Sequence, residues 1–434
     1  MPSQRKISVW KARELPPDWF KRKAIDEKGS EAVETNVKTI IAAVRAKGDT
    51  AVIEFTEKFD KTKLTAKNLR VTKAEIEAAY KVVSKEQVAA LKLMKNRLSS
   101  REKLTLQQDQ AKTSRDGITV QTVLRPLESV GCYVPGGRAV YPSTVVMTAV
   151  PAKVAGVKRI VVCSPPTAQG TINPLILVAA DICEVDEVYK VGGVQAIAAL
   201  AYGTKTIKPV KKIVGPGSKY VTMAKVLVSQ DVAIDLPAGP SEVLVLADET
   251  ANPKMVAADM VSQAEHGADS VAGLVTTSEK FAGNVEKALG QLAASAERGD
   301  IVKESLSAYG FIITCQDTDK MVELANAFAP EHLEIMTKDP MEIAEKITSA
   351  GVILIGPYSP VALSDYGSGT NHVLPTGGFG GSFSGLSVFD FMRRVNIVES
   401  TKDGLQKVKD SIKVLTEAES LPNHYKAVEA RFQE

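Results

Sequence analysis

The sequence predicts an α/β protein with two Rossmann-like domains, mainly parallel sheets, a small extended N-terminal arm and a helical C-terminal arm. After about residue 118, short runs rich in Val and Ile alternate with helix-like segments, and the early runs end in Gly, Pro or Ser. Continuous apolar strands that alternate with helices are typical of a parallel sheet covered on both faces. The alternation comes in two series, and a chain of 434 residues with 44% apolar content is large enough for two or more domains.

The first thirty residues are charged and contain both tryptophans, Trp10 and Trp19. This segment is too short for a core of its own, so it must pack on another domain or on a partner subunit. From Glu31 an amphipathic helix is expected, with Gly48 as its stop. Further helical patterns cover residues 73–80 and 85–98.

Two series of strands follow. The first series is predicted over residues 158–163, 187–191 and 212–214, with an Ala-rich helix over 194–202. The second series is predicted over residues 242–247, 271–276, 311–315, 333–336 and 352–355. The Gly-rich residues 377–385 are expected to form a loop, and 389–434 are expected to be mostly charged helix. Because both ends of the chain are arm-like, an intertwined oligomer is favoured.

Composition excludes several classes of protein. Lys plus Arg number 54 against 51 Asp plus Glu, no basic stripe stands out, and only 5% of residues are aromatic, which argues against a nucleic-acid binder. No apolar run is long enough to span a bilayer, and the N-terminus lacks a secretory signal. The cysteines are widely spaced, which is typical of reduced intracellular proteins. A cytoplasmic protein without membrane contact is expected.

Histidine is rare and always stands among polar residues that resemble ligands. The four histidines are His266, His332, His372 and His424. Imidazole is the side chain that most often binds transition metals and transfers protons near neutral pH. The pattern therefore predicts a metal site or an acid–base site.

Gln263 and His266 are three residues apart in a predicted helix over 256–265, so they share one face. This spacing suits two ligands of one metal ion. The alternative is a surface glutamine and a helix-terminal histidine that the helix dipole favours as a cation. Pairing with Asp365 and His424 would favour the metal, but spacing alone does not show it.

Glu331 and His332 come directly before a predicted strand. Neighbouring residues of a strand point to opposite faces, so both can serve one cleft only in the irregular segment before it. There His332 could accept a proton and Glu331 could activate water; a capping glutamate and an exposed histidine are the alternative. The polar, glycine-containing segment 365–372 is either a ligand-binding segment or an ordinary turn.

No intact GxGxxG motif follows a strand. Instead, Gly192-Gly193 and Gly215-Pro216-Gly217 each stand between a strand and a helix, where a pyrophosphate can meet a helix N-terminus. Tyr133 stands in a further turn and could cover a flat ring. Each of these segments also fits a simple tight turn. Phe383 occupies the serine position of a GxSxG pattern, and no base for Cys132 as a nucleophile is evident.

Five blocks together resemble one family, the histidinol dehydrogenases. They are GCYVPGG (131–137), LPAGPSE (236–242), SQAEHG (262–267), PEHLE (330–334) and GTNHVLPT (369–376). The resemblance covers almost the whole chain, from Glu31 to His424. It implies a homodimeric zinc enzyme with shared active sites that oxidises L-histidinol to L-histidine through L-histidinaldehyde, using two NAD, in the last reaction of histidine biosynthesis.

The resemblance also implies roles for individual residues. One Zn²⁺ per subunit would be held by Gln263, His266, Asp365 and, from the partner subunit, His424. Substrate-binding positions are Ser241, Gln263, His266, His332, Asp365, His372, Glu419 and His424. The acid–base pair would be Glu331 and His332, and NAD would contact Tyr133, Gln195 and Ser218. Ser218 departs from the family pattern, since many relatives have Asn there and a hydroxyl has a shorter reach.

The implied organisation has four parts. They are an N-terminal arm (1–28), an α/β domain with most of the zinc and catalytic site (29–131 and 242–386), an NAD-binding Rossmann-like domain (132–241), and a C-terminal arm (387–434) exchanged with the partner subunit. Three rivals are a relative that acts on another amino alcohol or diol, a zinc hydrolase, and a non-catalytic binding protein. Glu419 and His424 argue against the first rival because they supply an imidazole-recognising arm.

Overall fold

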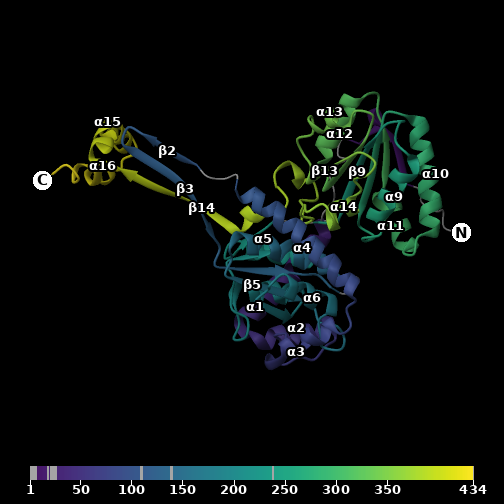
Figure 1. The fold of residues 1–434 in the computed structure, drawn as a ribbon, viewed down its shortest axis with the longest axis horizontal. Helices are drawn as coiled ribbons and strands as arrows, with labels where there is room; N and C mark the ends of the chain where they lie inside the picture. Colours follow the sequence, from purple (N-terminus) through teal and green to yellow (C-terminus); the bar gives the residue numbers. More distant parts are fainter. Residues whose placement is uncertain are drawn as a thin grey trace.

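The computed structural model describes residues 7–16, 19, 27–107, 111–136, 140–236 and 239–433. It contains two α/β units and an elongated arm that extends away from them (Figure 1). Each unit is built on a parallel sheet, of five and six strands respectively, and the arm contains a three-stranded antiparallel sheet. The predicted α/β class with mainly parallel sheets is confirmed.

The five-stranded sheet has the order β6-β5-β4-β7-β8. Its strands are β4 (Ser129–Tyr133), β5 (Arg159–Ser164), β6 (Glu187–Lys190), β7 (Lys212–Val214) and β8 (Ala233–Ile234). The connecting helices are α5 (Pro142–Ala155), α6 (Pro174–Ile182), α7 (Gly193–Tyr202) and α8 (Lys219–Val228). The chain leaves β4 toward β5 on one side and returns as β7 on the other, so the carboxyl ends of β4 and β7 flank the switch point where open α/β sheets bind ligands.

The N-terminal helices cover both faces of this five-stranded sheet. Helices α1 (Glu27–Lys47) and α2 (Asp49–Asp60) share a core with α7 and β7, whereas α3 (Lys73–Tyr80) and α4 (Lys85–Leu106) share a core with α5 and α6 on the other face. The domain division predicted from the sequence instead placed residues 29–131 in one domain with residues 242–386. The division differs because a helical period reveals an apolar face but not which sheet buries it.

The six-stranded sheet has the order β1-β11-β10-β9-β12-β13. Its strands are β1 (Ser8–Lys11), β9 (Glu242–Ala247), β10 (Val271–Thr276), β11 (Phe311–Thr314), β12 (His332–Met336) and β13 (Val352–Ile355). Its helices are α9 (Pro253–Ala264), α10 (Glu279–Ser295), α11 (Gly299–Tyr309), α12 (Thr318–Phe328), α13 (Pro340–Ala344) and α14 (Val361–Tyr366). Within the predicted Gly-rich loop lies one 3₁₀ turn, Phe379–Gly381.

The N-terminal segment packs on its own chain. Strand β1 pairs in parallel with β11 at the edge of the six-stranded sheet. The rings of Trp10 and Trp19 lie 6.3 and 5.7 Å from the ring of Phe311, measured between centroids. This arm was expected to pack either on another domain or on a partner subunit. Its described part packs on another domain of the same chain. Residues 1–6, 17–18 and 20–26 of the predicted arm lie outside the described residues.

The arm contains segments from both halves of the chain. Strand β14 (Met392–Ser400) pairs antiparallel with β3 (Ile118–Pro126), which also pairs with β2 (Lys112–Arg115). Helices α15 (Lys402–Ala418) and α16 (Pro422–Glu429) lie at its tip. The expectation of mostly charged helix over 389–434 holds for α15 and α16 but missed β14, because this strand is exposed along almost its whole length and lacks the buried alternation that marks a strand.

A buried ion pair fixes the loop between β7 and α8. The side chains of Lys225 and Asp235 are 2% and 1% exposed and contact each other. Lys225 Nζ also donates to Gly215 O at 2.9 Å, and Gly215 N donates to Asp235 Oδ2 at 2.7 Å. Gly215 has φ +116°, and a Cβ there would lie 2.2 Å from Tyr133 O. The loop is therefore held against the end of β4 in a conformation that requires glycine.

Among the described residues, no helix is long and apolar enough to cross a membrane. All four cysteines are free and buried. Burial raises the pKa of the Cys132 thiol to about 12. A thiolate is therefore disfavoured, and Cys132 packs as a small apolar residue rather than acting as a nucleophile.

Candidate active site

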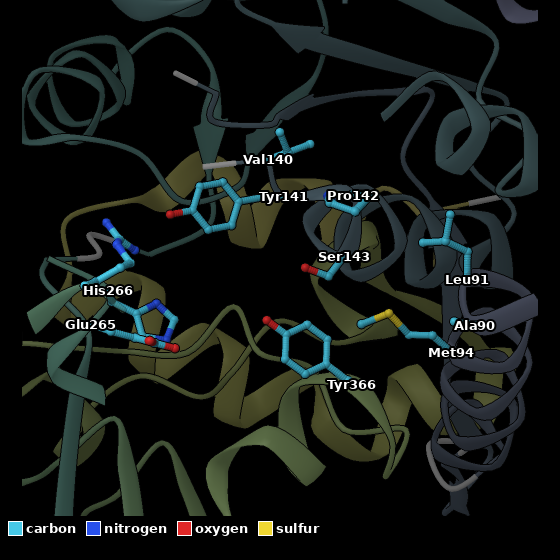
Figure 2. A pocket seen from close by; sticks show the side chains of 11 residues that line it. Ala90, Leu91, Met94, Val140, Tyr141, Pro142, Ser143, Glu265, His266 and Tyr366 are labelled. Carbon is cyan, nitrogen blue, oxygen red and sulfur yellow. The ribbon is translucent and has the colours of Figure 1, made fainter. Parts of the chain in front are cut away.

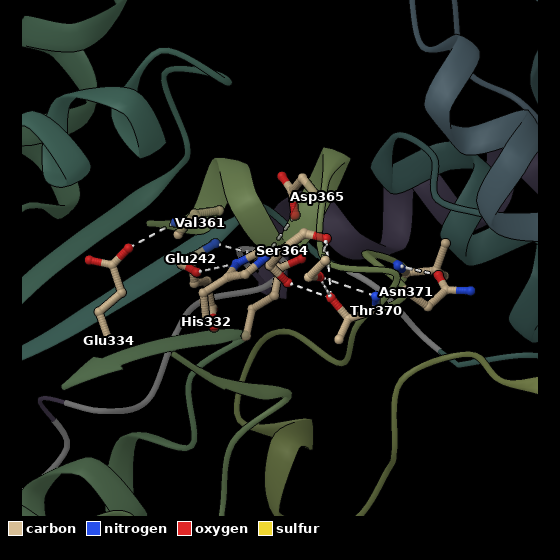
Figure 3. Close-up of polar contacts among 11 residues, drawn as sticks. Glu242, His332, Glu334, Val361, Ser364, Asp365, Thr370 and Asn371 are labelled. Atoms are coloured by element: carbon tan, nitrogen blue, oxygen red, sulfur yellow. Dashed lines mark hydrogen bonds and ion pairs between the residues drawn. The ribbon is translucent and has the colours of Figure 1, made fainter. Parts of the chain in front are cut away.

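Of the predicted site residues, His332 and Asp365 lie near the amino ends of β9 and β12 (Figure 3). His332 is the first residue of β12, and Asp365 lies on α14. His332 Nε2 is 3.5 Å from Asp365 Oδ1. Asp365 also interacts electrostatically with His266 and His372. The structure therefore brings together four side chains from three segments that are distant in sequence.

The backbone of Glu242 holds the predicted acid–base pair. Glu242 N donates to Glu331 Oε2 at 2.8 Å, and His332 Nδ1 lies 3.0 Å from Glu242 O. A carbonyl oxygen only accepts, so Nδ1 carries the hydrogen and Nε2 is the ring nitrogen left for chemistry. Glu331 lies in the segment before β12, as expected, whereas His332 is the first residue of the strand and not part of that irregular segment. Glu331 Oε2 is nevertheless 3.6 Å from His332 Nδ1.

Glu331 and His332 are buried and share an unusual electrostatic setting. Burial raises the pKa of Glu331 to about 8, although His332 and the Glu242 N–H act in the opposite direction. Burial disfavours the charged form of His332, but Glu331 and Asp365 outweigh burial and raise its pKa to about 9. Two neighbouring groups that both titrate near neutral pH can pass a proton between solvent, substrate and each other.

Sequence analysis did not single out Glu242. Besides its two backbone contacts, its Oε1 accepts from Gly377 N at 3.0 Å, which ties the Gly-rich loop to the site. The residue ends one of the quoted blocks and begins β9, and that position was the only available signal. Contacts made by backbone atoms leave no residue-type pattern in a sequence.

Several buried polar atoms in this cluster have no hydrogen-bond partner among the described residues. They are both amide atoms of Gln263, His332 Nε2 and Asp365 Oδ1. Gln263 is only 1% exposed. Buried polar atoms are nearly always satisfied in native proteins, so such a group marks a place for a ligand or an ion. An amide oxygen, an imidazole and a carboxylate are donors that Zn²⁺ accepts, so the residues present fit this metal.

No group of three or more His, Cys, Asp or Glu side chains in the described part of the chain is arranged to hold a metal ion. The predicted ligand set has a simple reason for this result. Gln263 is an amide and not one of these four residue types, and His424 lies at the tip of the arm. Of the four predicted ligands, only His266 and Asp365 are therefore of these types and also lie at the cluster.

Glu419 and His424 are not brought to this cluster within one chain. Glu419 caps the end of α15, and His424 lies on α16. Both are exposed at the tip of the arm, on the opposite side of the five-stranded unit from α9 and α14 (Figure 1). A single chain therefore lacks two of the predicted substrate-binding side chains at its own site.

A cavity of about 390 Å³ lies between the two units beside His266 (Figure 2). Tyr141 and Ser143, at the start of α5, line it from the first unit, and Glu265 and Tyr366 line it from the second. A cavity of this size accommodates a small molecule. Its place between the units allows groups bound on either one to meet there.

Two further predicted substrate-binding residues, Ser241 and His372, lie near Glu242 and Asp365. Ser241 directly precedes Glu242, and Ser241 O accepts from Val271 N. Burial lowers the pKa of His372, although Asp365 acts in the opposite direction. The segment that carries His372 is fixed to the first unit, because Asn371 Nδ2 donates to Met147 O at 2.8 Å.

The predicted cofactor residues gather at the carboxyl edge of the five-stranded sheet. Tyr133 ends β4, and its hydroxyl accepts from Gly193 N at 3.1 Å. Gln195, in the first turn of α7, is 1% exposed and has no partner for either amide atom. Ser218 is exposed at the start of α8 and makes no capping hydrogen bond. This edge is where open α/β sheets bind dinucleotides.

Comparisons with known proteins agree with the resemblance. The sequence model of the family described as histidinol dehydrogenase matches residues 23–432. A curated histidinol dehydrogenase from Methanothermobacter thermautotrophicus is 45% identical over 398 residues, covering 92% of this chain and 93% of the relative. One from Bacteroides fragilis is 48% identical over 403 residues, covering 92% of each.

A solved structure also matches the whole fold. The crystal structure of histidinol dehydrogenase from Elizabethkingia anophelis aligns with a TM-score of 0.92 at 37% identity, covering 98% of each chain. The match includes both sheets and the arm, since almost no part of either chain is left out. The chain therefore belongs to the histidinol dehydrogenase family of oxidoreductases.

Proposed function

We propose that this chain catalyses the zinc-dependent, four-electron oxidation of L-histidinol to L-histidine through L-histidinaldehyde, with reduction of two NAD, in the last step of histidine biosynthesis. Family membership supplies the reaction. The observation that carries the site assignment is the convergence of His332, Asp365 and His266 beside the unpartnered amide of Gln263. Residues 132–241 would bind NAD and 242–386 would carry the zinc and catalytic residues; a cytoplasmic location stays a prediction from the sequence.

One zinc ion per subunit would be held by Gln263, His266, Asp365 and His424 of the partner subunit. When bound, zinc anchors the amine and imidazole of the substrate, but it has no redox chemistry of its own, so hydride passes to NAD. The chain's own donors support this set, because the Gln263 amide and Asp365 Oδ1 are buried without hydrogen-bond partners. Holding the substrate in one orientation lowers the entropy cost of both oxidations.

His332 would accept the alcohol proton in each oxidation. Its Nδ1 is occupied by Glu242 O, so Nε2 is the accepting atom. Once Asp365 is engaged as a ligand, His332 loses one of the two carboxylates that raise its pKa, and its neutral form becomes more populated. Glu331 would activate the water that hydrates the aldehyde, a step for which its raised pKa suits it as a base.

We propose a homodimer with shared active sites, and the position of the arm supports this proposal. Its tip carries Glu419 and His424 away from the cluster of the same chain. The arm also leaves large apolar side chains exposed, among them Val398, Val414 and Leu415. Exposed apolar residues that gather on one element are typical of an interface between chains. A second copy of the chain would cover them and receive the two site residues.

The stoichiometry of the reaction tests the proposed function. Metal-loaded protein mixed with NAD and L-histidinol is expected to form two NADH per L-histidine, counted by absorbance and by product analysis. One NADH per substrate would contradict the four-electron reaction. Turnover without NAD would favour the zinc hydrolase, and binding without turnover would favour a non-catalytic protein.

Glu331→Gln is expected to separate the two oxidations. The amide still accepts from Glu242 N–H but cannot take a proton from water, so the first oxidation should stay within about tenfold while the second falls by ~10²-fold or more. Stopped-flow measurements should then show a burst of one NADH per site and accumulation of aldehyde.

Glu334→Gln provides a matched control for this experiment. Glu334 is a buried carboxylic acid on β12, three residues after Glu331, and it accepts from Val361 N at 2.9 Å. Its substitution is expected to change both oxidations to a similar extent. Equal loss of both half-reactions in Glu331→Gln would refute the separate role of Glu331.

A further inference from the structure

A second group of buried polar atoms without hydrogen-bond partners lies in the first unit. It comprises Thr56 Oγ1, Asp60 Oδ2, Ser164 Oγ and both amide atoms of Gln195. Thr56, Ser164 and Gln195 are at most 1% exposed. Of the four residues, only Gln195 has a role in the proposed cofactor site. Buried polar atoms that no described residue satisfies are rare in native proteins, so those of Asp60 and Ser164 point to a polar ligand at this edge of the sheet.

Asp60 lies beside the carboxyl ends of β4 and β5, although it belongs to α2. Two residues later, Thr62 Oγ1 donates to Thr167 O at 2.9 Å, in the loop that follows β5. The Asp60 carboxylate also interacts electrostatically with Tyr133 at the end of β4. These contacts on two sides place Asp60 at the same sheet edge as the predicted cofactor residues.

Among the residues that the structure describes, no cation compensates the Asp60 carboxylate. Burial alone raises its pKa to about 6, with no lysine or arginine acting in the opposite direction. The neighbouring Lys61 turns back and donates from Nζ to Lys58 O at 2.9 Å. The carboxylate is therefore largely ionised at pH 7.5 and is available to accept hydrogen bonds from a ligand.

Dinucleotide-binding sheets usually carry an acid at the end of the second strand, where it accepts hydrogen bonds from a ribose. In this unit β5 is the second strand, and it ends in Ser164, followed by Pro165 and Pro166. The acid is missing from that position. Asp60 supplies a carboxylate to the same end of the strand from a helix outside the βαβ unit.

We propose that Asp60 accepts hydrogen bonds from the ribose hydroxyls of the adenosine half of the dinucleotide, with Ser164 beside it, and that this carboxylate selects NAD over NADP. The inference rests on the proposed cofactor site at Tyr133 and Gln195. A negative charge at this place accepts from a diol but repels a 2′-phosphate. Asp60 is thus a specificity-determining residue.

Asp60→Asn tests the inference with ADP-ribose and its 2′-phosphorylated form as ligands of the metal-loaded protein. Loss of the charge-assisted hydrogen bonds should weaken ADP-ribose binding about tenfold in calorimetric titrations. Binding of the 2′-phosphorylated ligand should be unchanged or stronger, because the repulsion is removed. In kinetics, the KM for NAD should rise with little change in kcat.

Glu57→Gln is the matched control. Glu57 lies on the same helix, is exposed and pairs with Lys63, so the substitution changes the same charge without facing the sheet edge. It should leave the affinity for both ligands unchanged. Wild-type affinity for ADP-ribose in Asp60→Asn, or an equal loss for both ligands, would overturn the role of Asp60. If the unsubstituted protein bound neither ADP-ribose nor NAD, the cofactor site itself would be refuted instead.

Discussion

His424→Ala is expected to lose zinc and activity together. The imidazole on α16 is the proposed fourth ligand, and a three-donor site of Gln263, His266 and Asp365 holds the ion more weakly. Because a catalytic metal contributes several kcal/mol, kcat should fall by ~10²-fold or more. Elemental analysis of the purified protein measures the metal content. Tyr425→Phe, at the next residue of the same helix, should retain full zinc. Full zinc in His424→Ala would remove this residue from the ligand set.

Mixed dimers decide which chain supplies His424. His424→Ala and His332→Asn are each expected to be inactive alone. In a mixed dimer with exchanged arms, one site combines an intact His332 from one chain with an intact His424 from the other. Random redistribution of subunits should restore about a quarter of wild-type activity, because half of the dimers are mixed and each contains one complete site. No recovery would mean that each site uses its own chain's arm.

Lys225→Met is expected to lower the free energy of unfolding by ~3–5 kcal/mol, because it leaves the Asp235 carboxylate buried without a cation. Denaturant titration followed by circular dichroism measures the change. Asp235→Asn combined with Lys225→Met should recover part of the loss, since the amide is neutral and can still accept from Gly215 N–H. A loss below about 1 kcal/mol in the single variant would show that water or rearrangement satisfies Asp235.

Eight of the eleven parallel strands in the described part of the chain could be predicted from the sequence to within about one residue, whereas β1, β4 and β8 were missed, and β4 lies where a turn at Tyr133 was expected. β9 and β10 match the predicted ranges 242–247 and 271–276, and all six residues of each strand are buried. A strand covered on both faces needs apolar residues at every position, so its length is visible as a continuous run. For β9 and β10, the need for apolar residues on both faces is itself the pattern that can be recognised in the sequence.

The arm and the packing of the N-terminal helices could not be predicted in this way. β14 and β2 are exposed on both faces, so burial does not constrain their residue types. β14 lies far from its partner β3 in sequence, and composition does not indicate the register between such distant strands. β2 is close to β3, but its exposed polar residues give no strand pattern. Likewise, the apolar faces of α1 and α4 predict that something covers them, but not which of two sheets does so.

At the candidate site, residue type helped to identify the residues whose side chains would bind the metal or transfer protons. The histidines are rare and could be singled out by residue type, whereas the assignment of Gln263 and Asp365 as metal ligands came from the family resemblance. Glu242 contacts the acid–base pair through its backbone, and Asp60 reaches the sheet edge from a separate helix. Neither arrangement follows from a motif, because both depend on how distant segments approach one another.

The proposed acid–base pair, Glu331 and His332, lies next to Glu242 at the amino ends of β9 and β12, and not at their carboxyl ends. The carboxyl ends of these strands are therefore separated from the proposed acid–base pair by the length of the sheet. They border a hollow that is lined by Asp248, Glu249 and Lys338, among others. Turns at this end of the sheet can change in length or carry a grafted peptide or reporter domain while turnover is preserved, which makes them suitable handles for immobilising or labelling the enzyme.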